Sequence, residues 1–305
     1  MAEEYRWRQF LGPRYWPGWA GLAVLRLLAF LPLPLIAAAG ALLGELLYWV
    51  MAERRHITRT NIRACFPQLT TRQQRRLARA HFRAFAQATF AVPIAWWGSV
   101  ARLRRLVRRT GEEHLRTALA AKKPVILLVA HFVSIELGGM GLSADYPLID
   151  LYKRPKNRLF DYLIRLCRVR FGGRLVERRE GIKPALRAIR DGFAFYYPTD
   201  QDQGRDGAVF APFFGIPTAT LPGLSRVAAV THAVVLPCFT RQLPWGQGYE
   251  VILKSPLENF PTEDFESDTI RMNRIIEDAV REMPEQYFWS HRRFKTRPES
   301  EEPFY

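Results

Sequence analysis

Residues 124–139 read PVILLVAHFVSIELGG, and this stretch decides the fold class. Its first part, Val125–Val129, is an uncharged run of strand length that is rich in β-branched residues, which is typical of a strand buried on both faces of a parallel sheet. His131 follows where that strand should end, and Gly138 and Gly139 leave room for another group to approach the backbone. Because ligands of open α/β sheets bind at the carboxyl ends of the strands, the stretch predicts a functional site beside His131.

Glu136, five residues after His131, is the first candidate partner for the imidazole. On one regular helix the two side chains would point about 140° apart, since each residue turns the helix by ~100°. The pair can form if His131 lies in the turn after the strand while Glu136 sits in the first helical turn and reaches back. A carboxylate in that position would support His131 as a general base, because it stabilises the imidazolium. The alternative is a loop histidine next to a first-turn carboxylate that faces the helix dipole.

The sequence around His131 offers no nucleophile of its own. Ser134 lacks the G-x-S-x-G elbow that exposes a catalytic serine, and no cysteine is close in the sequence. The hydroxyl group that such a base would activate should therefore belong to a substrate.

Strand and helix patterns alternate after Lys123. Strands are expected at residues 125–129, 148–152, 174–176, 193–197, 233–239 and 250–253, and helices at 159–170, 182–191, 221–230 and 264–282. This order predicts an α/β fold with a mostly parallel sheet flanked by helices. Phosphate-loop and dinucleotide-binding fingerprints are absent from the sequence.

The chain of 305 residues has 45 Lys and Arg against 29 Asp and Glu, a formal net charge of +16. Such a surplus predicts an anionic partner, such as lipid headgroups, a phosphorylated substrate or an acidic carrier protein. No helix-turn-helix, zinc or RNA-binding signature accompanies the charge, which disfavours nucleic acid. The three cysteines are widely spaced, so we expect buried free thiols in a reducing compartment.

The N-terminal region carries a membrane signal. Leu27–Gly44 is uncharged over 18 residues, close to the ~20 that span a bilayer, although Pro32 and Pro34 interrupt it. Basic residues follow it, which by the positive-inside tendency predicts that the rest of the chain is cytoplasmic. We therefore expect residues 1–51 to form a hydrophobic helical membrane anchor and residues 52–305 to form the α/β domain. A buried helical hairpin is the alternative.

Basic amphipathic helices are expected between residues 52 and 120. Residues 71–87 place an apolar face on a basic helix, and Arg102–Arg109 interleaves leucine and valine with arginine. Each segment could lie on anionic lipid or pack on the domain, and Arg102–Arg109 could also bind an acidic carrier protein.

Asp200 and Asp202 follow another expected strand, at the same edge of the sheet as His131. Two acids at this spacing could bind a metal, but no His or further carboxylate completes a site. We expect Asp200 to hold an arginine or a sugar hydroxyl, with an Asx-turn as the alternative.

The His-x4-Glu pattern HFVSIELG resembles the signature of the bacterial lipid A late acyltransferases of the lauroyl and myristoyl type. These are relatives of the glycerolipid acyltransferases, which usually carry His-x4-Asp. Further blocks that resemble the family occur in family order over most of the chain: NIRACFP at 61–67, YKRPKN at 152–157, YPTDQD at 197–202, PFFGIP at 212–217 and YFWSHRRFK at 287–295.

The resemblance implies a glycerolipid-acyltransferase-like fold and a lipid A biosynthesis acyltransferase of the inner membrane, with its catalytic domain on the cytoplasmic face. An acyl chain would pass from acyl carrier protein to a hydroxyacyl chain of an anionic Kdo-lipid A precursor, with no metal or organic cofactor. His131 would be the general base and Glu136 would stabilise the imidazolium. Other membrane lipid acyltransferases, of glycerolipid or inositol mannoside type, and a non-catalytic membrane adaptor remain open.

The resemblance also implies substrate-binding residues. In the family's loop an arginine precedes a proline, which matches Arg154, and an asparagine matches Asn157. Arg179 lies where relatives carry another arginine, although Arg178 is adjacent and the register is open by one residue. Arg154 or Arg179 would offset negative charge on the reacting centre or on the phosphates of the precursor.

Overall fold

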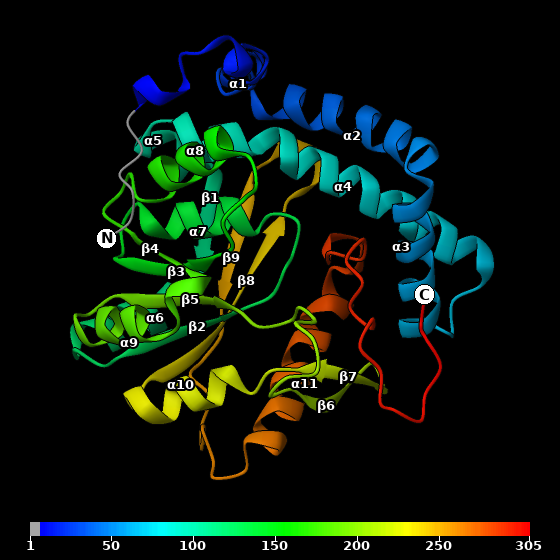
Figure 1. Cartoon of the computed structure of the whole chain (residues 1–305), viewed down its shortest axis with the longest axis vertical. Helices are drawn as coiled ribbons and strands as arrows, with labels where there is room; N and C mark the ends of the chain where they lie inside the picture. The colour runs from blue at the N-terminus through cyan, green and yellow to red at the C-terminus, as the bar shows by residue number, and fades with distance from the viewer. Residues whose placement is uncertain (1–6) are drawn as a thin grey trace.

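A seven-stranded sheet forms the centre of the computed structural model, which describes residues 7–305 (Figure 1). The strand order is β1-β9-β8-β2-β5-β3-β4, and every neighbouring pair is parallel except β8 and β9. The strands are β1 (Val107–Thr110), β2 (Val125–Val129), β3 (Leu148–Tyr152), β4 (Arg174–Glu177), β5 (Ala194–Pro198), β8 (Val234–Gln242) and β9 (Tyr249–Leu253). The predicted mostly parallel α/β sheet is confirmed.

Two parts of the strand structure are not apparent from the sequence pattern. Residues 107–110, in the region where basic amphipathic helices are expected, form the edge strand β1 and pair with β9. Strands β6 (Val209–Phe213) and β7 (Ile216–Thr220) form a separate antiparallel hairpin that packs on α11. Strand β1 is basic and lacks the continuous apolar run that identifies β2, and Pro212 and Pro217 interrupt the strand pattern of β6 and β7.

Helices cover both faces of the sheet (Figure 1). They are α1 (Trp16–Leu28), α2 (Leu33–Val50), α3 (Ala52–Cys65), α4 (Thr71–Trp97), α5 (Val100–Leu106), α6 (Glu112–Ala120), α7 (Ile135–Ser143), α8 (Arg158–Arg168), α9 (Lys183–Arg190), α10 (Gly223–Thr231) and α11 (Phe265–Glu282). Short 3-10 turns are η1 (Trp7–Phe10), η2 (Pro13–Tyr15), η3 (Arg178–Glu180), η4 (Pro244–Gly246) and η5 (Pro284–Gln286).

Strand β2 is the centre of the core, and all five of its residues are buried. Alternate side chains of a strand point to opposite faces, so Ile126 and Leu128 pack with α9, α10 and α11, whereas Val125, Leu127 and Val129 pack with α4, α6 and α7. This two-sided burial, expected from the uncharged run, places the end of β2 under cover of helices from both faces.

The N-terminal helices α1 and α2 lie on α4 rather than on the sheet (Figure 1). The helices α2 and α4 approach closely, because a Cβ atom on Gly40 would lie 2.6 Å from the Cα of Gln87 and one on Gly44 would lie 2.4 Å from the Phe82 carbonyl oxygen. Among the described residues, α2 is the one helix long and apolar enough to cross a membrane, which is weak evidence for an anchor.

The three cysteines, Cys65, Cys167 and Cys238, are buried free thiols, as expected.

Candidate active site

His131 lies two residues beyond the end of β2 and is held by Asp200, which lies two residues beyond the neighbouring strand β5. The two strands run parallel with Val129 opposite Pro198, so their continuations bring these side chains together. The Nδ1 atom of His131 is 2.6 Å from Oδ1 of Asp200. The backbone N–H of His131 also donates to both carboxylate oxygens, at 3.1 and 3.0 Å. Asp200 was expected to hold an arginine or a sugar hydroxyl, and it holds the histidine instead.

The Asp200 carboxylate is almost fully buried, with 2% of its side chain exposed, whereas 25% of the His131 side chain is exposed. Burial alone would raise the pKa of Asp200, but the charge and hydrogen bonds of His131 outweigh it and lower that pKa to about 2. Asp200 therefore stays ionised and accepts a hydrogen bond from Nδ1–H. In the neutral ring this leaves Nε2 as the nitrogen that can accept a proton.

Glu136, in the first turn of α7, is bound to other partners. Its carboxylate accepts hydrogen bonds from Arg168 Nη2 at 2.5 Å and from the indole Nε1 of Trp96 at 2.9 Å. Burial raises the pKa of Glu136, but the Arg168 charge and these hydrogen bonds outweigh it and lower the pKa. The prediction that Glu136 reaches back to His131 is corrected here, because the helix turns its carboxylate toward α4 and α8.

Arg168 is shared between two carboxylates. Its Nη1 atom donates to Oδ2 of Asp150, on β3, at 2.9 Å while its other nitrogens bind Glu136. Burial raises the pKa of Asp150 to about 6, although Arg168 opposes this. Sequence reasoning missed Arg168 and Asp150, since one is among several arginines on a basic helix and the other lies inside an apolar strand.

These groups open onto a cavity of about 380 Å³ at the carboxyl edge of the sheet. His131, Glu136, Asp150 and Arg168 line it together with apolar side chains of α7, α8, β3 and β5, which include Ile135, Met140, Leu148, Leu151, Ile164 and Tyr196. Further basic side chains, Lys153, Arg174 and Arg178, also line it. The cavity thus combines apolar walls with a general-base candidate and several cations.

The four predicted substrate-binding residues do not line this cavity, and one of them, Asp200, holds His131 as described above. Arg154 donates to the buried Asp161 at 3.0 Å. Asn157 caps α8, because its side-chain oxygen accepts from the N–H groups of Leu159 and Phe160. Arg179 is exposed on η3, whereas its neighbour Arg178 lines the cavity.

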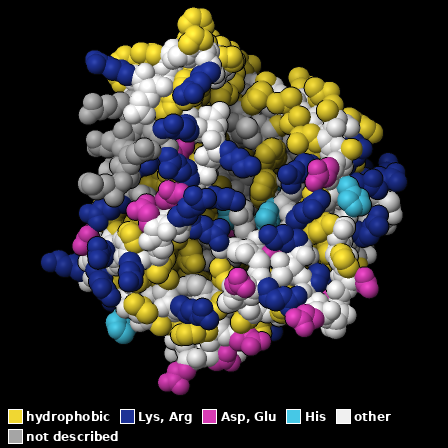
Figure 2. All heavy atoms as spheres, viewed as in Figure 1, with side chains coloured by type: hydrophobic (Ala, Val, Ile, Leu, Met, Phe, Trp, Pro, Cys, Tyr) yellow, Lys and Arg dark blue, Asp and Glu magenta, His cyan; other side chains and the backbone are white. Residues whose placement is uncertain are grey.

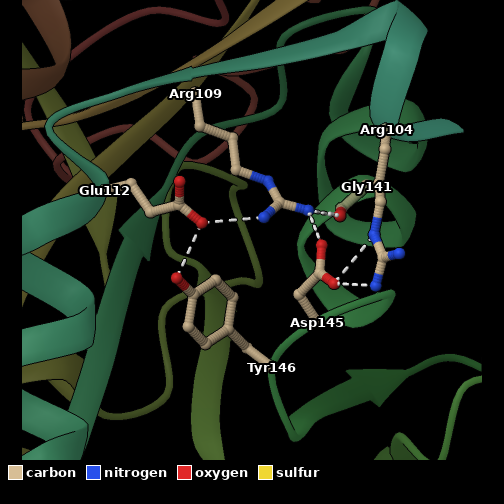
Figure 3. Close-up of polar contacts among 6 residues, drawn as sticks. All are labelled: Arg104, Arg109, Glu112, Gly141, Asp145 and Tyr146. Atoms are coloured by element: carbon tan, nitrogen blue, oxygen red, sulfur yellow. Dashed lines mark hydrogen bonds and ion pairs between the residues drawn. The ribbon is translucent and has the colours of Figure 1, made fainter.

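The basic segment Arg102–Arg109 is largely occupied by contacts within the fold (Figure 3). Arg104 and Arg109 both bind the carboxylate of Asp145, just after α7, and Arg109 also donates to Glu112 at 2.7 Å. Arg102 donates to carbonyl groups at the end of α1. These contacts tie β1 and α5 to α7 and α1. Arg104 stays exposed in its ion pair, and Arg105 and Arg108 are exposed without an acidic partner among residues 7–305.

The fold and the site define an α/β protein with a His–Asp pair at the mouth of a partly apolar, cationic cavity. Residues 5–296 match the family model described as bacterial lipid A biosynthesis acyltransferase. The chain is 33% identical to the lipid A biosynthesis lauroyltransferase of Escherichia coli K12, covering 95% of this chain and 94% of that protein. It is 32% identical to the palmitoleoyltransferase of the same organism (98% and 97% covered) and 35% identical to a lipid A biosynthesis acyltransferase of Haemophilus influenzae (96% and 92%).

The chain therefore belongs to the bacterial lipid A biosynthesis acyltransferase family, and the resemblance found in its sequence motifs is confirmed. It is an acyltransferase of lipid A biosynthesis.

Proposed function

We propose that the protein transfers a fatty acyl chain from acyl carrier protein to the hydroxyl group of a hydroxyacyl chain on an anionic lipid A precursor, with His131 as the general base. The observation that carries this proposal is the buried Asp200 carboxylate on Nδ1 of His131, with the imidazole lining a cavity of about 380 Å³. A base held in this way needs only a substrate hydroxyl and an acyl donor within reach.

Nε2 of His131 removes the hydroxyl proton as the oxygen attacks the thioester carbonyl of the donor. Asp200 stabilises the imidazolium that forms. When the tetrahedral intermediate collapses, the carbon–sulfur bond breaks and the imidazolium returns its proton to the departing thiolate. Atoms and charge balance without a covalent enzyme intermediate or a cofactor.

The cations of the cavity have a second task in this proposal. Arg168, fixed by Glu136 and Asp150, presents positive charge to the oxyanion of the tetrahedral intermediate or to a phosphate of the precursor. Lys153, Arg174 and Arg178 add charge along the cavity for phosphate groups. Glu136 thus acts as a positioning residue for Arg168. Arg154 and Asn157 contribute indirectly: both contact α8 and so help to hold the helix that carries Arg168.

The site of action in this proposal is the cytoplasmic face of the inner membrane. The acceptor is a membrane lipid, and the protein carries an apolar N-terminal helix followed by basic residues. An acyl carrier protein donor fits the net charge of +16, since such carriers are strongly acidic in the systems that this family resembles.

The test is acyl transfer by the purified full-length protein, measured by mass spectrometry of the lipid A precursor with carrier-bound donor. The wild-type protein should add the mass of one acyl chain. His131→Ala should lower the rate by about two to four orders of magnitude, the usual scale for general acid–base catalysis. His232→Asn is the matched control, because His232 is exposed and left-handed in conformation, which asparagine tolerates. If the wild-type protein acylates a glycerolipid and not the lipid A precursor, the proposed acceptor is wrong and the protein is a membrane acyltransferase of another type.

A further inference from the structure

Exposed apolar side chains are concentrated on one part of the protein. Of the 18 large hydrophobic side chains exposed in residues 7–305, 13 belong to residues 7–51, three to α8 and its C-cap, one is Trp245, and the last, Val230, lies on α10. Helix α1 adjoins α8, where a Cβ on Gly18 would lie 2.9 Å from Leu159, and Gly246 lies against Pro34 at the start of α2. Helix α8 and the turn that carries Trp245 therefore each adjoin the N-terminal helices, and Figure 2 shows yellow side chains gathered over α2.

Helix α2 has two unlike faces. Leu35, Leu42, Leu46 and Trp49 are exposed and recur at helical spacing, whereas the opposite face is buried on α4 through the close contacts at the two glycines described above. The Glu45 carboxylate accepts hydrogen bonds from Arg83 at 2.7 and 2.9 Å and also pairs with Arg79. The helix is thus fixed along its length to the α/β domain.

A membrane crossing by α2 conflicts with these contacts. If α2 left α4, Glu45 would lose both arginines and enter the hydrocarbon without a partner. If α4 moved with α2, the arginines of α4 would enter it as well. Charged side chains are among the costliest groups in the hydrocarbon core. A helix that keeps α4 on one side and lipid on the other lies along the membrane surface instead.

A row of arginines lies beyond the C-terminal end of α2. Arg72, Arg75 and Arg76 line a surface groove of α4 together with Arg79 and Arg83. Within residues 7–305 no acidic side chain pairs with the first three. Lipid headgroup phosphates would complement this charge beside the apolar surface. A second copy of the chain, with the same basic groove, would not.

We infer that α2 docks in the plane of an anionic bilayer, with its leucine face in the lipid and the α4 arginine groove on the headgroups. This inference rests on the proposed action at a membrane and specifies how the protein sits there. Helix α8 joins the apolar surface and also lines the catalytic cavity through Ile164 and Arg168. The cavity is thus adjacent to the membrane plane that holds the acceptor.

The first test measures depth. Spin labels on Leu35→Cys, Leu42→Cys and Leu46→Cys are placed in the full-length protein in phosphatidylcholine–phosphatidylglycerol vesicles, with a label on Arg187→Cys of α9 as the aqueous control. Leu35 and Leu46 are about 16 Å apart along the helix axis at 1.5 Å per residue. In-plane docking predicts the same shallow depth for all three labels. A depth difference near that axial distance, as a crossing helix gives, overturns the inference.

The second test measures charge dependence by vesicle flotation. Arg72→Gln/Arg75→Gln/Arg76→Gln should lower binding to anionic vesicles at least tenfold and leave binding to phosphatidylcholine vesicles unchanged. The control Lys183→Gln/Arg187→Gln/Arg190→Gln removes three basic residues from α9 and should have no effect on either. Equal losses for both triple variants contradict the role of the groove.

Two further readouts separate the possible failures. In one outcome, the Leu42 labels of two molecules lie close together without lipid, and added vesicles leave them out of contact with lipid. A second copy of the chain then covers this face, which overturns the inference. His131→Ala should show wild-type depths. An active His131→Ala variant with shallow labels would contradict the proposed catalysis and leave the docking inference standing.

Discussion

Arg168 and its two carboxylates form a unit, so the effects of removing its members should not add. We expect Glu136→Gln and Arg168→Gln each to lower kcat by about 10- to 100-fold, because either change misplaces or removes the cation that faces the reacting centre. The double variant should be hardly worse than Arg168→Gln alone. Steady-state kinetics on carrier-bound donor, with thermal unfolding as a check on folding, provides the measurement. Additive losses would show that Glu136 acts independently of Arg168.

The raised pKa of Asp150 makes its contribution to the free energy of unfolding decrease as pH rises. Its folded-state pKa of about 6 lies above the ordinary value of 3.8, so the folded protein binds its proton more tightly than the unfolded chain does. The Asp150 contribution to stability is therefore lost as pH rises through about 6, by about 1 kcal/mol from pH 5 to pH 7.5, and it is measured as the difference between the wild type and Asp150→Asn. Asp150→Asn should lack this component. Denaturant unfolding at the two pH values measures it, and an identical pH dependence in both proteins would contradict the assignment.

At the scale of single elements, Asn157 starts α8, the helix that carries Arg168. Asn157→Ala removes a side-chain cap and should cost about 1 kcal/mol of stability, whereas Asn157→Asp keeps an acceptor oxygen and should cost much less. Calorimetric unfolding distinguishes the two. If Asn157 instead binds the substrate directly, both variants should raise KM while Asn157→Ala leaves the stability unchanged.

The segment from α5 to β1 has two kinds of arginine. Arg104 is exposed but paired with Asp145, whereas Arg105 and Arg108 are exposed with no acidic partner in residues 7–305 and are available to steer an acidic donor. Charge reversal at Arg105 and Arg108 should lower kcat/KM for carrier-bound donor several-fold more than for an uncharged thioester analogue, and added salt should narrow the difference. Equal losses with both donors at every salt concentration would remove this segment from carrier recognition.

At the scale of the whole molecule, the parallel sheet could be predicted because buried strands have a direct sequence signature. The bounds of β2 and β3 agree with prediction, whereas β1 is edge-paired and basic, so no apolar run identifies it. The position of His131 followed from the end of β2. The carboxylate partner of His131 could not be predicted in the same way, because spacing along the chain favoured Glu136. Only the pairing of β2 with β5 brings Asp200 to the imidazole ring.

Arg168 could not be predicted for a related reason. Its function depends on which carboxylates α7 and β3 bring to one helix face, and the sequence of α8 contains several other arginines. The apolar length of α2 could be predicted from the sequence, whereas its packing depends on glycine contacts with α4 that no hydropathy pattern encodes.

We assign Asp200, rather than Glu136, as the carboxylate that supports His131 as a base. The most direct measurement is the pH dependence of kcat for Asp200→Asn beside Glu136→Gln, with the same carrier-bound donor. We expect kcat to fall by about two to four orders of magnitude in Asp200→Asn, with little change in KM, and by a distinctly smaller factor in Glu136→Gln. Near-wild-type turnover by folded Asp200→Asn, with a shift of the His131-dependent pH profile in Glu136→Gln alone, would contradict this assignment.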